Sequence, residues 1–136
     1  MKTLCIIFSL LGFYFSCQSA FSEDGWVLWE KRQQQDVRKD GKAGSNYLDW
    51  EILNAFPAWQ ECDIYKQNLW KVKKATFTEI KEKCTKNKCD NKIISLDDGV
   101  PFESLNVIHQ FSNGTIGHQY LKWFCLPGTL DPRERK

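Results

Sequence analysis

The stretch "LNVIHQFSNGTIGHQYLKWFC" (105–125) decides the fold, because it contains the clearest hairpin of the chain. Two segments rich in strand-forming residues, 105–111 and 116–125, flank the dipeptide Asn113-Gly114. Asn-Gly between two such segments favours a two-residue turn of type I′, which joins antiparallel neighbours. In that register His109 lies directly opposite His118, provided that the strand has no bulge at Gly117. We therefore expect the sheet to be antiparallel.

Three other segments, 25–32, 47–53 and 92–96, also have strand character. In "YLDWEIL" (47–53) Leu48, Trp50 and Ile52 alternate with acidic residues, which is typical of a half-buried strand whose apolar side faces the core. The polar, glycine-containing segment 33–46 has no periodicity, and we expect it to be a mobile loop.

Between these strands the apolar period changes to that of a helix. Apolar or small residues recur every three or four positions after Pro57, which can open a helix; they are Cys62, Tyr65, Leu69, Val72 and Thr76. This stripe predicts an amphipathic helix from 58 to about 74, and segment 76–84 either extends it or forms a second short helix. Trp59 and Trp70 flank the stripe and are expected to pack in or beside the core. The predicted fold is α+β: an antiparallel sheet of four or five strands with one long helix on one face.

The first 22 residues have the pattern of a secretory signal peptide. Lys2 is their only charged side chain, the run 4–15 is apolar, and small residues precede Glu23. We place cleavage after Ser22, so that residues 23–136 form a single small domain; the alternative is a lipid anchor on Cys17. The apolar run is shorter than the roughly 20 residues that a membrane span needs.

Four cysteines follow the predicted leader, and in an exported domain they indicate two disulfides. Three connectivities exist; we favour Cys84–Cys89, within the turn-prone "CTKNKC", together with Cys62–Cys125. A four-cysteine zinc site is the alternative, but the chain lacks the paired C-x-x-C spacing of such sites.

The sequence contains none of the common catalytic or phosphate-binding signatures, and it predicts no cofactor. The formal net charge of +2 does not call for a nucleic-acid partner. Two histidines on opposed strand positions could share a weakly bound metal ion, which makes His109 and His118 the candidate metal ligands.

Two candidate binding surfaces remain. Lysines are frequent between 66 and 92, so Lys71, Lys73 and Lys74 beside the tryptophans could meet an anionic polymer. Trp26 and Trp29 have opposite parity on the first strand, so at most one of them faces the core. The other is either covered by the 33–46 loop or available to contact another protein. The tail "FCLPGTLDPRERK" (124–136) is interpreted as a strand end, a type II turn at 126–129 with Gly128 at positive φ, and a solvated end.

Three short blocks resemble a group of small exported bacterial proteins of unknown function: "WVLWEK", "W-x-x-x-x-AF-x-x-x-x-EC" and "CLP-x-T-x-DPR". The matching positions are Trp26, Leu28, Trp29, Glu30, Trp50, Ala55, Phe56, Glu61, Cys62, Cys125, Leu126, Pro127, Thr129, Asp131, Pro132 and Arg133. Gly128 stands where that group has Asp. The resemblance implies export, bacterial origin and a Cys62–Cys125 pairing, and it implies no activity.

The expectation from the sequence is therefore an exported, non-enzymatic binding or structural protein of the cell envelope or the extracellular space, secreted or periplasmic. Another protein or an anionic polymer is the expected partner. The alternative is a metal-binding protein or an enzyme that uses the face carrying His109 and His118.

Overall fold

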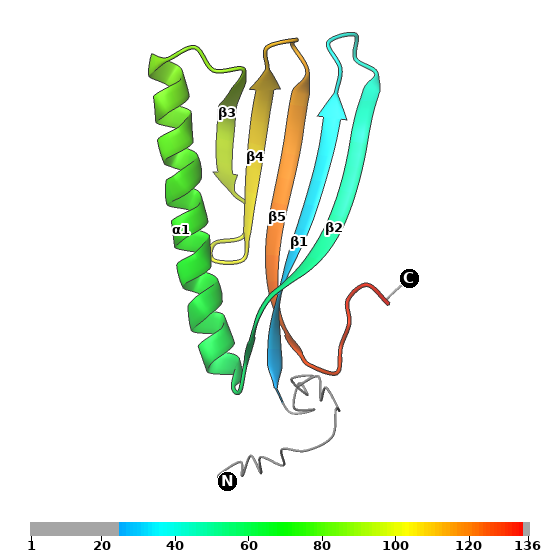
Figure 1. Cartoon of the computed structure of the whole chain (residues 1–136), viewed down its shortest axis with the longest axis vertical. Helices are drawn as coiled ribbons and strands as arrows, with labels where there is room; N and C mark the ends of the chain where they lie inside the picture. The colour runs from blue at the N-terminus through cyan, green and yellow to red at the C-terminus, as the bar shows by residue number, and fades with distance from the viewer. Residues whose placement is uncertain (1–24, 135–136) are drawn as a thin grey trace, which may run out of the picture.

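The computed structural model describes residues 25–134, in which five strands form one sheet and a single long helix packs against it (Figure 1). The elements are β1 (Trp26–Val37), β2 (Ala43–Phe56), α1 (Trp59–Lys86), β3 (Asn91–Asp98), β4 (Ser104–Phe111) and β5 (Ile116–Pro127). All neighbours in the order β2-β1-β5-β4-β3 are antiparallel. The predicted α+β fold with one helix is confirmed. The predicted signal peptide and the Cys17 anchor lie outside the described residues.

The helix is continuous, so segment 76–84 extends it and no second helix forms. It contacts all five strands, most extensively β3, and runs alongside the β3 edge in Figure 1. No helix in residues 25–134 has both the length and the apolarity that crossing a membrane requires.

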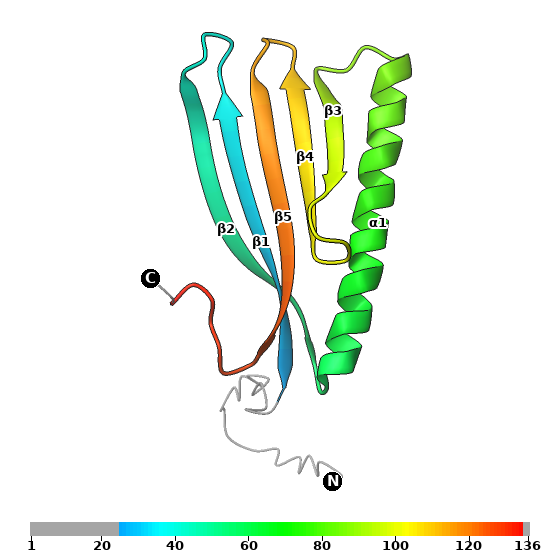
Figure 2. The ribbon, with the colours of Figure 1, turned by 180° about the vertical axis from the view of Figure 1, so that it is seen from behind.

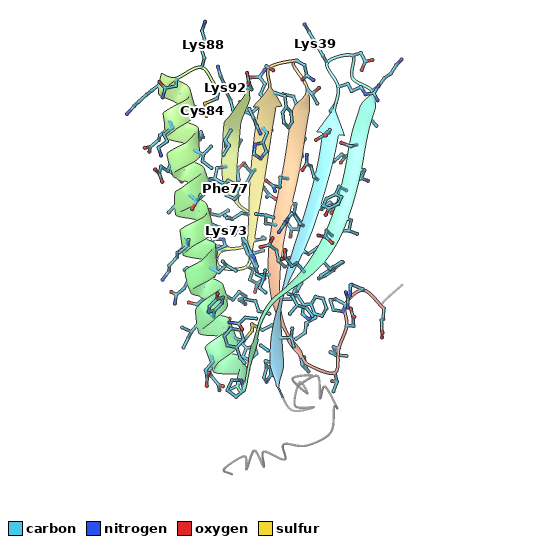
Figure 3. The ribbon with its side chains drawn as sticks, in the orientation of Figure 1. Lys39, Lys73, Phe77, Cys84, Lys88 and Lys92 are labelled. Atoms are coloured by element: carbon cyan, nitrogen blue, oxygen red, sulfur yellow. A yellow bond between two sulfur atoms is a disulfide. The ribbon has the colours of Figure 1, made fainter. Side chains whose placement is uncertain are left out.

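The buried stripe of α1 differs from the predicted one. Cys62, Trp70 and Cys84 are buried, whereas Val72 is 62% exposed and Thr76 is also exposed. The helix is thus rotated about its axis relative to the prediction, with Trp70 turned toward the sheet. The indole of Trp70 enters the core, and its Nε1 donates a hydrogen bond to the carbonyl oxygen of Ser104 at 3.0 Å. Figure 3 shows the same side of the helix turned toward the sheet at Lys73, Phe77 and Cys84.

The core lies between α1 and the sheet and is built from side chains of alternate strand positions. Its fully or nearly fully buried members are Leu28, Cys62, Leu105, Leu121 and Trp123, with Trp70 beside them. Glu30 is buried next to this cluster and accepts hydrogen bonds from three donors: Nε and Nη2 of Arg32, and Nε1 of Trp123 at 2.8 Å. A buried carboxylate requires such partners, and Arg32, whose side chain is 36% exposed, links Glu30 to the surface.

Two disulfides close the structure, and both predicted pairs are confirmed. Cys62 in the first turns of α1 is bonded to Cys125 of β5, with their Cα atoms 6.0 Å apart. Cys84 near the end of α1 is bonded to Cys89 just before β3. The first bond holds the start of the helix on the end of the last strand, and the second joins the end of the helix to the loop before the edge strand.

The segment 33–46, expected to be a mobile loop, is a long hairpin instead. β1 and β2 remain paired up to Val37 and Ala43, and only the turn that joins them lies outside strands. Gly41 has φ +78° in this turn, and its N–H donates to the carbonyl oxygen of Arg38. β1 also pairs with β5 along its whole length, so backbone hydrogen bonds hold its polar half, residues 33–37, in the sheet. An apolar sequence pattern does not reveal such bonds.

The second hairpin has a three-residue loop instead of the predicted two-residue turn. The N–H of Phe111 donates to the carbonyl oxygen of Thr115, and Gly114 has φ +84°. This is the arrangement of a type I turn followed by a glycine in the left-handed region. Residues 110 and 116 are therefore opposed, and the register differs by one residue from the predicted one.

The C-terminal segment also departs from its predicted turn. The N–H of Gly128 donates to the carbonyl oxygen of Gly25 at 2.7 Å, so Gly128 continues the pairing of β5 with the start of β1. The turn follows one residue later, where Leu130 N–H donates to the Pro127 carbonyl oxygen. Among described glycines, only Gly41 and Gly114 have positive φ, so the type II turn at 126–129 is wrong. Both views place this segment on the β2 side, away from α1 (Figures 1 and 2).

Candidate functional site

The side of the sheet that faces away from α1 carries the candidate site. Cys125 points toward α1, to which it is bonded, and Leu28 lies opposite it in the register. Because side chains alternate along a strand, the neighbouring rows point the other way. These rows define the open face. Three of them run across β2, β1 and β5: Ile52–Trp29–Phe124, Trp50–Lys31–Lys122 and Leu48–Gln33–Tyr120.

The apolar side of β2 therefore faces outward, which overturns the expectation that it faces the core. Leu48 is 56% exposed and Ile52 is 44% exposed. The acidic side of β2 lies on the other side of the sheet, where Glu51 pairs with Arg32 at 3.0 Å. Three large apolar side chains in one exposed row of a strand are unusual for a surface without a partner.

A groove of about 260 Å³ lies on this face where the C-terminal segment crosses it. Trp50 and Phe124 form part of its lining, with their ring centroids 5.6 Å apart. The remaining lining residues are Leu126 from β5 and Leu130 and Pro132 from the C-terminal segment. The groove is thus apolar and joins two strands to the tail of the chain.

Two lysines stand beside the groove, and each covers one of its aromatic rings. Lys31 Nζ lies 5.5 Å from the Trp50 ring centroid, and Lys122 Nζ lies 5.0 Å from that of Phe124. Such placement is favourable for a cation because of the negative charge above an aromatic face. The two lysines are directly opposed in the β1–β5 register, and neither forms an ion pair with a carboxylate of residues 25–134.

The wall that the tail contributes is anchored by Arg133. Its guanidinium lies 5.1 Å from the ring centroid of Trp29, and it also forms an ion pair with Asp131. Hydrogen bonding to Arg133 holds the pKa of Asp131 below its usual value, and the same contact raises the pKa of Arg133. The segment 131–133 is therefore folded onto the sheet. Of the solvated end predicted for 134–136, only Glu134 is among the described residues, and it is exposed.

The two histidines do not form the predicted pair. His109 lies opposite Gly117, and His118 lies opposite Ile108. A shift of one residue moves a side chain to the other face of the sheet, so the two imidazoles belong to opposite faces. His109 instead contacts Asn91 Oδ1 through Nδ1 at 3.1 Å and Gln119 Oε1 through Nε2 at 3.2 Å. No group of three metal-ligating side chains occurs in the part of the chain that the structure describes.

Trp26 and Trp29 do not form the contact surface that the sequence suggested. Trp26 is half-buried and packs against the core on the helix side. Trp29 is only 3% exposed, because Arg133 covers it, and its Nε1 has no hydrogen-bond acceptor among the described residues. Neither ring forms an exposed platform: Trp29 lies on the open face but is buried there, and the aromatic residues that line the groove are Trp50 and Phe124.

The three candidate lysines of α1 do not form one surface. Lys71 lies 5.7 Å from the Phe102 ring centroid, and Lys74 binds Asp98 at 2.6 Å above Trp70. Lys73 lies on the side of the helix that faces the sheet (Figure 3). Lys71 and Lys74 line a shallow hollow of about 460 Å³ that also contains Glu79 and Glu82, so the charge there is mixed.

Sequence reasoning missed the groove residues Phe124, Leu130 and Pro132. One signal was present in "LKWFCL" (121–126), in which apolar residues occupy both parities of the strand. Such a segment is expected where both faces of the sheet are covered, and here the tail provides the second cover. Comparisons of the chain with protein-family models, with curated proteins and with solved structures return no match.

Proposed function

We propose that this protein is an exported binding protein without catalytic activity, and that it holds another protein on the open face of its sheet. The observation that carries this proposal is the orientation of β2, which turns Leu48, Trp50 and Ile52 away from the helix and the core. A protein gains by burying such a row, and a docked partner would supply the cover.

Export is part of the proposal and has its support in the two disulfides. Such bonds form and persist in oxidising compartments and are rare in reducing ones. One of them joins the end of the helix to the loop before β3, and the other joins its start to the strand that carries Phe124. The binding face is therefore built on a framework suited to the periplasm or the extracellular space.

Photo-cross-linking in the cells that produce the protein tests this function. A photoreactive residue is placed at Ile52 on the open face or, as the matched control, at Val72, an exposed branched apolar residue of α1. We expect one defined partner to cross-link from position 52 and not from position 72. The purified partner should then bind the Val72→Lys variant and fail to bind Ile52→Lys, with both variants folded by circular dichroism. Equal cross-linking from both positions, or binding that survives Ile52→Lys, would contradict the proposal.

A further inference from the structure

The two lysines of the open face occupy an unfavourable arrangement in the unbound protein. Lys31 and Lys122 are directly opposed on neighbouring strands and point to the same side of the sheet. Like charges opposed in this way destabilise a sheet. The rows on either side contribute tryptophan, phenylalanine, glutamine and tyrosine at β1 and β5, so no carboxylate neutralises the lysines from these positions.

The groove next to them supplies apolar surface, and the lysines beside it supply cationic donors. Its lining is apolar, and the cation of Arg133 is already paired with Asp131. A ligand with complementary chemistry therefore has an apolar group for the groove and an anionic group for the lysines. The ammonium group of each lysine lies over an aromatic ring of the groove, which places its charge close to the groove.

From this geometry we infer that the groove recognises a segment of the partner protein in which an acidic residue flanks a large apolar side chain. The apolar side chain enters the groove between Trp50 and Pro132, and the carboxylate lies between Lys31 and Lys122. This inference rests on the proposed function and specifies the chemistry of its partner.

A second copy of this chain does not fit as the occupant of the face. Stacking two open faces would bring a second pair of opposed lysines toward the first pair, where like charges repel. An acidic partner, by contrast, relieves the repulsion that already exists within one chain. Charge complementarity thus favours a different protein over self-association.

A matched pair of fluorescent probes tests the charge requirement. 8-Anilinonaphthalene-1-sulfonate carries an aryl framework and an anion, and N-phenyl-1-naphthylamine carries the same framework without the anion. We expect the anionic probe to bind more tightly, and we expect its binding to weaken as salt is added because the lysines are partly solvent-accessible. Equal affinity of the two probes would overturn the inference and leave an apolar docking face intact. No binding of either probe would also count against the proposed function.

Variants of single lysines locate the anion. Lys31→Gln and Lys122→Gln each remove one charge and keep most of the aliphatic stem over the ring. We expect each to weaken the anionic probe about fivefold and to leave the neutral probe unchanged. Lys92→Gln is the control, since Lys92 is an exposed lysine of β3 at the other end of the molecule (Figure 3). If the control weakens the anionic probe as much as the groove variants do, the effect is one of net charge and the inference is wrong.

Displacement of the anionic probe then identifies the class of ligand. A blocked hexapeptide Gly-Glu-Phe-Leu-Glu-Gly is expected to displace the probe, and its twin with glutamine in place of both glutamates is expected to do so at least fivefold less well. Displacement by laurate with no difference between the peptides would assign the groove to a lipid and refute a protein segment as its occupant.

Discussion

The orientation of β2 can be tested by truncating one leucine on each side of the sheet. Leu48 keeps 56% of its surface exposed, whereas Leu28 of β1 is fully buried against the helix. Complete burial of a leucine side chain contributes about 1.5–3 kcal/mol, and less than half of the Leu48 surface is removed from water. We therefore expect Leu48→Ala to lower the free energy of unfolding by about 1 kcal/mol. Leu28→Ala also leaves a cavity, and we expect a loss of about 2–5 kcal/mol.

Urea denaturation with the disulfides intact, followed by tryptophan fluorescence, measures both values from the midpoint and the slope. The slopes of the two variants should agree with that of the parent, because neither substitution changes how much of the chain unfolds. A loss above about 2 kcal/mol for Leu48→Ala would show that this side of β2 faces a core. The open face would then be wrongly assigned, and the proposed binding site on it would be refuted.

Three further predictions concern the interactions that hold the framework. Glu30→Gln leaves a buried donor without a carboxylate and should cost about 3 kcal/mol in urea denaturation, against less than about 1 kcal/mol for the exposed Glu51→Gln; equal costs would show that burial of Glu30 is unimportant. The hydrogen bond from Lys66 lowers the pKa of Asp63 in the folded state. The ionised Asp63 therefore stabilises the fold fully above the usual carboxyl pKa of about 4, and this stabilisation is lost as the pH falls through the lower folded value. Asp63→Asn should flatten the dependence of stability on pH below about pH 4, and an unchanged dependence would contradict this. Replacing both cysteines of one disulfide with serine should cost about 4 kcal/mol for Cys62–Cys125 and about 2 kcal/mol for Cys84–Cys89. Thermal unfolding measures both costs, and the reverse order would contradict the loop-entropy argument.

The alternation of β2 could be read from the sequence, but its direction could not. Leu48, Trp50 and Ile52 do share one face, as the pattern indicates. Alternation shows only that the two faces of a strand differ, and the rest of the fold decides which face is covered. Here the acidic side turns toward Arg32, which pairs with Glu51, and the helix lies over the other edge of the sheet. A rule that places every apolar row in the core therefore cannot identify the open face.

The register of the hairpin at Asn113-Gly114 could be predicted from the sequence only to within one residue. The dipeptide locates the turn correctly, since Gly114 has the positive φ that favours glycine. Asn113 Oδ1 accepts a hydrogen bond from the Thr115 N–H at 2.9 Å, and this contact belongs to the longer loop. The ring of Phe111 also lies so close to Gly117 that an added Cβ atom there would be 3.0 Å from it. These contacts form only in the folded hairpin, so the sequence alone could not decide that the histidines separate.

The disulfide between α1 and β5 fixes the groove on the far side of the sheet, because both depend on the same register. Cys125 must point toward Cys62, so Phe124 and Leu126 must point away from α1 and line the groove. A slip of β5 by one residue would break the bond and turn Phe124 into the core. The Gly128–Gly25 hydrogen bond extends the pairing of β5 with the start of β1. Beyond it, the contact of Arg133 with the Trp29 ring holds Leu130 and Pro132 in place, and these two residues form the rest of the groove lining. The Cys62–Cys125 bond and the contact of Arg133 with Trp29 thus keep the open face in one arrangement. Such preorganisation would reduce the entropy cost of docking the proposed partner.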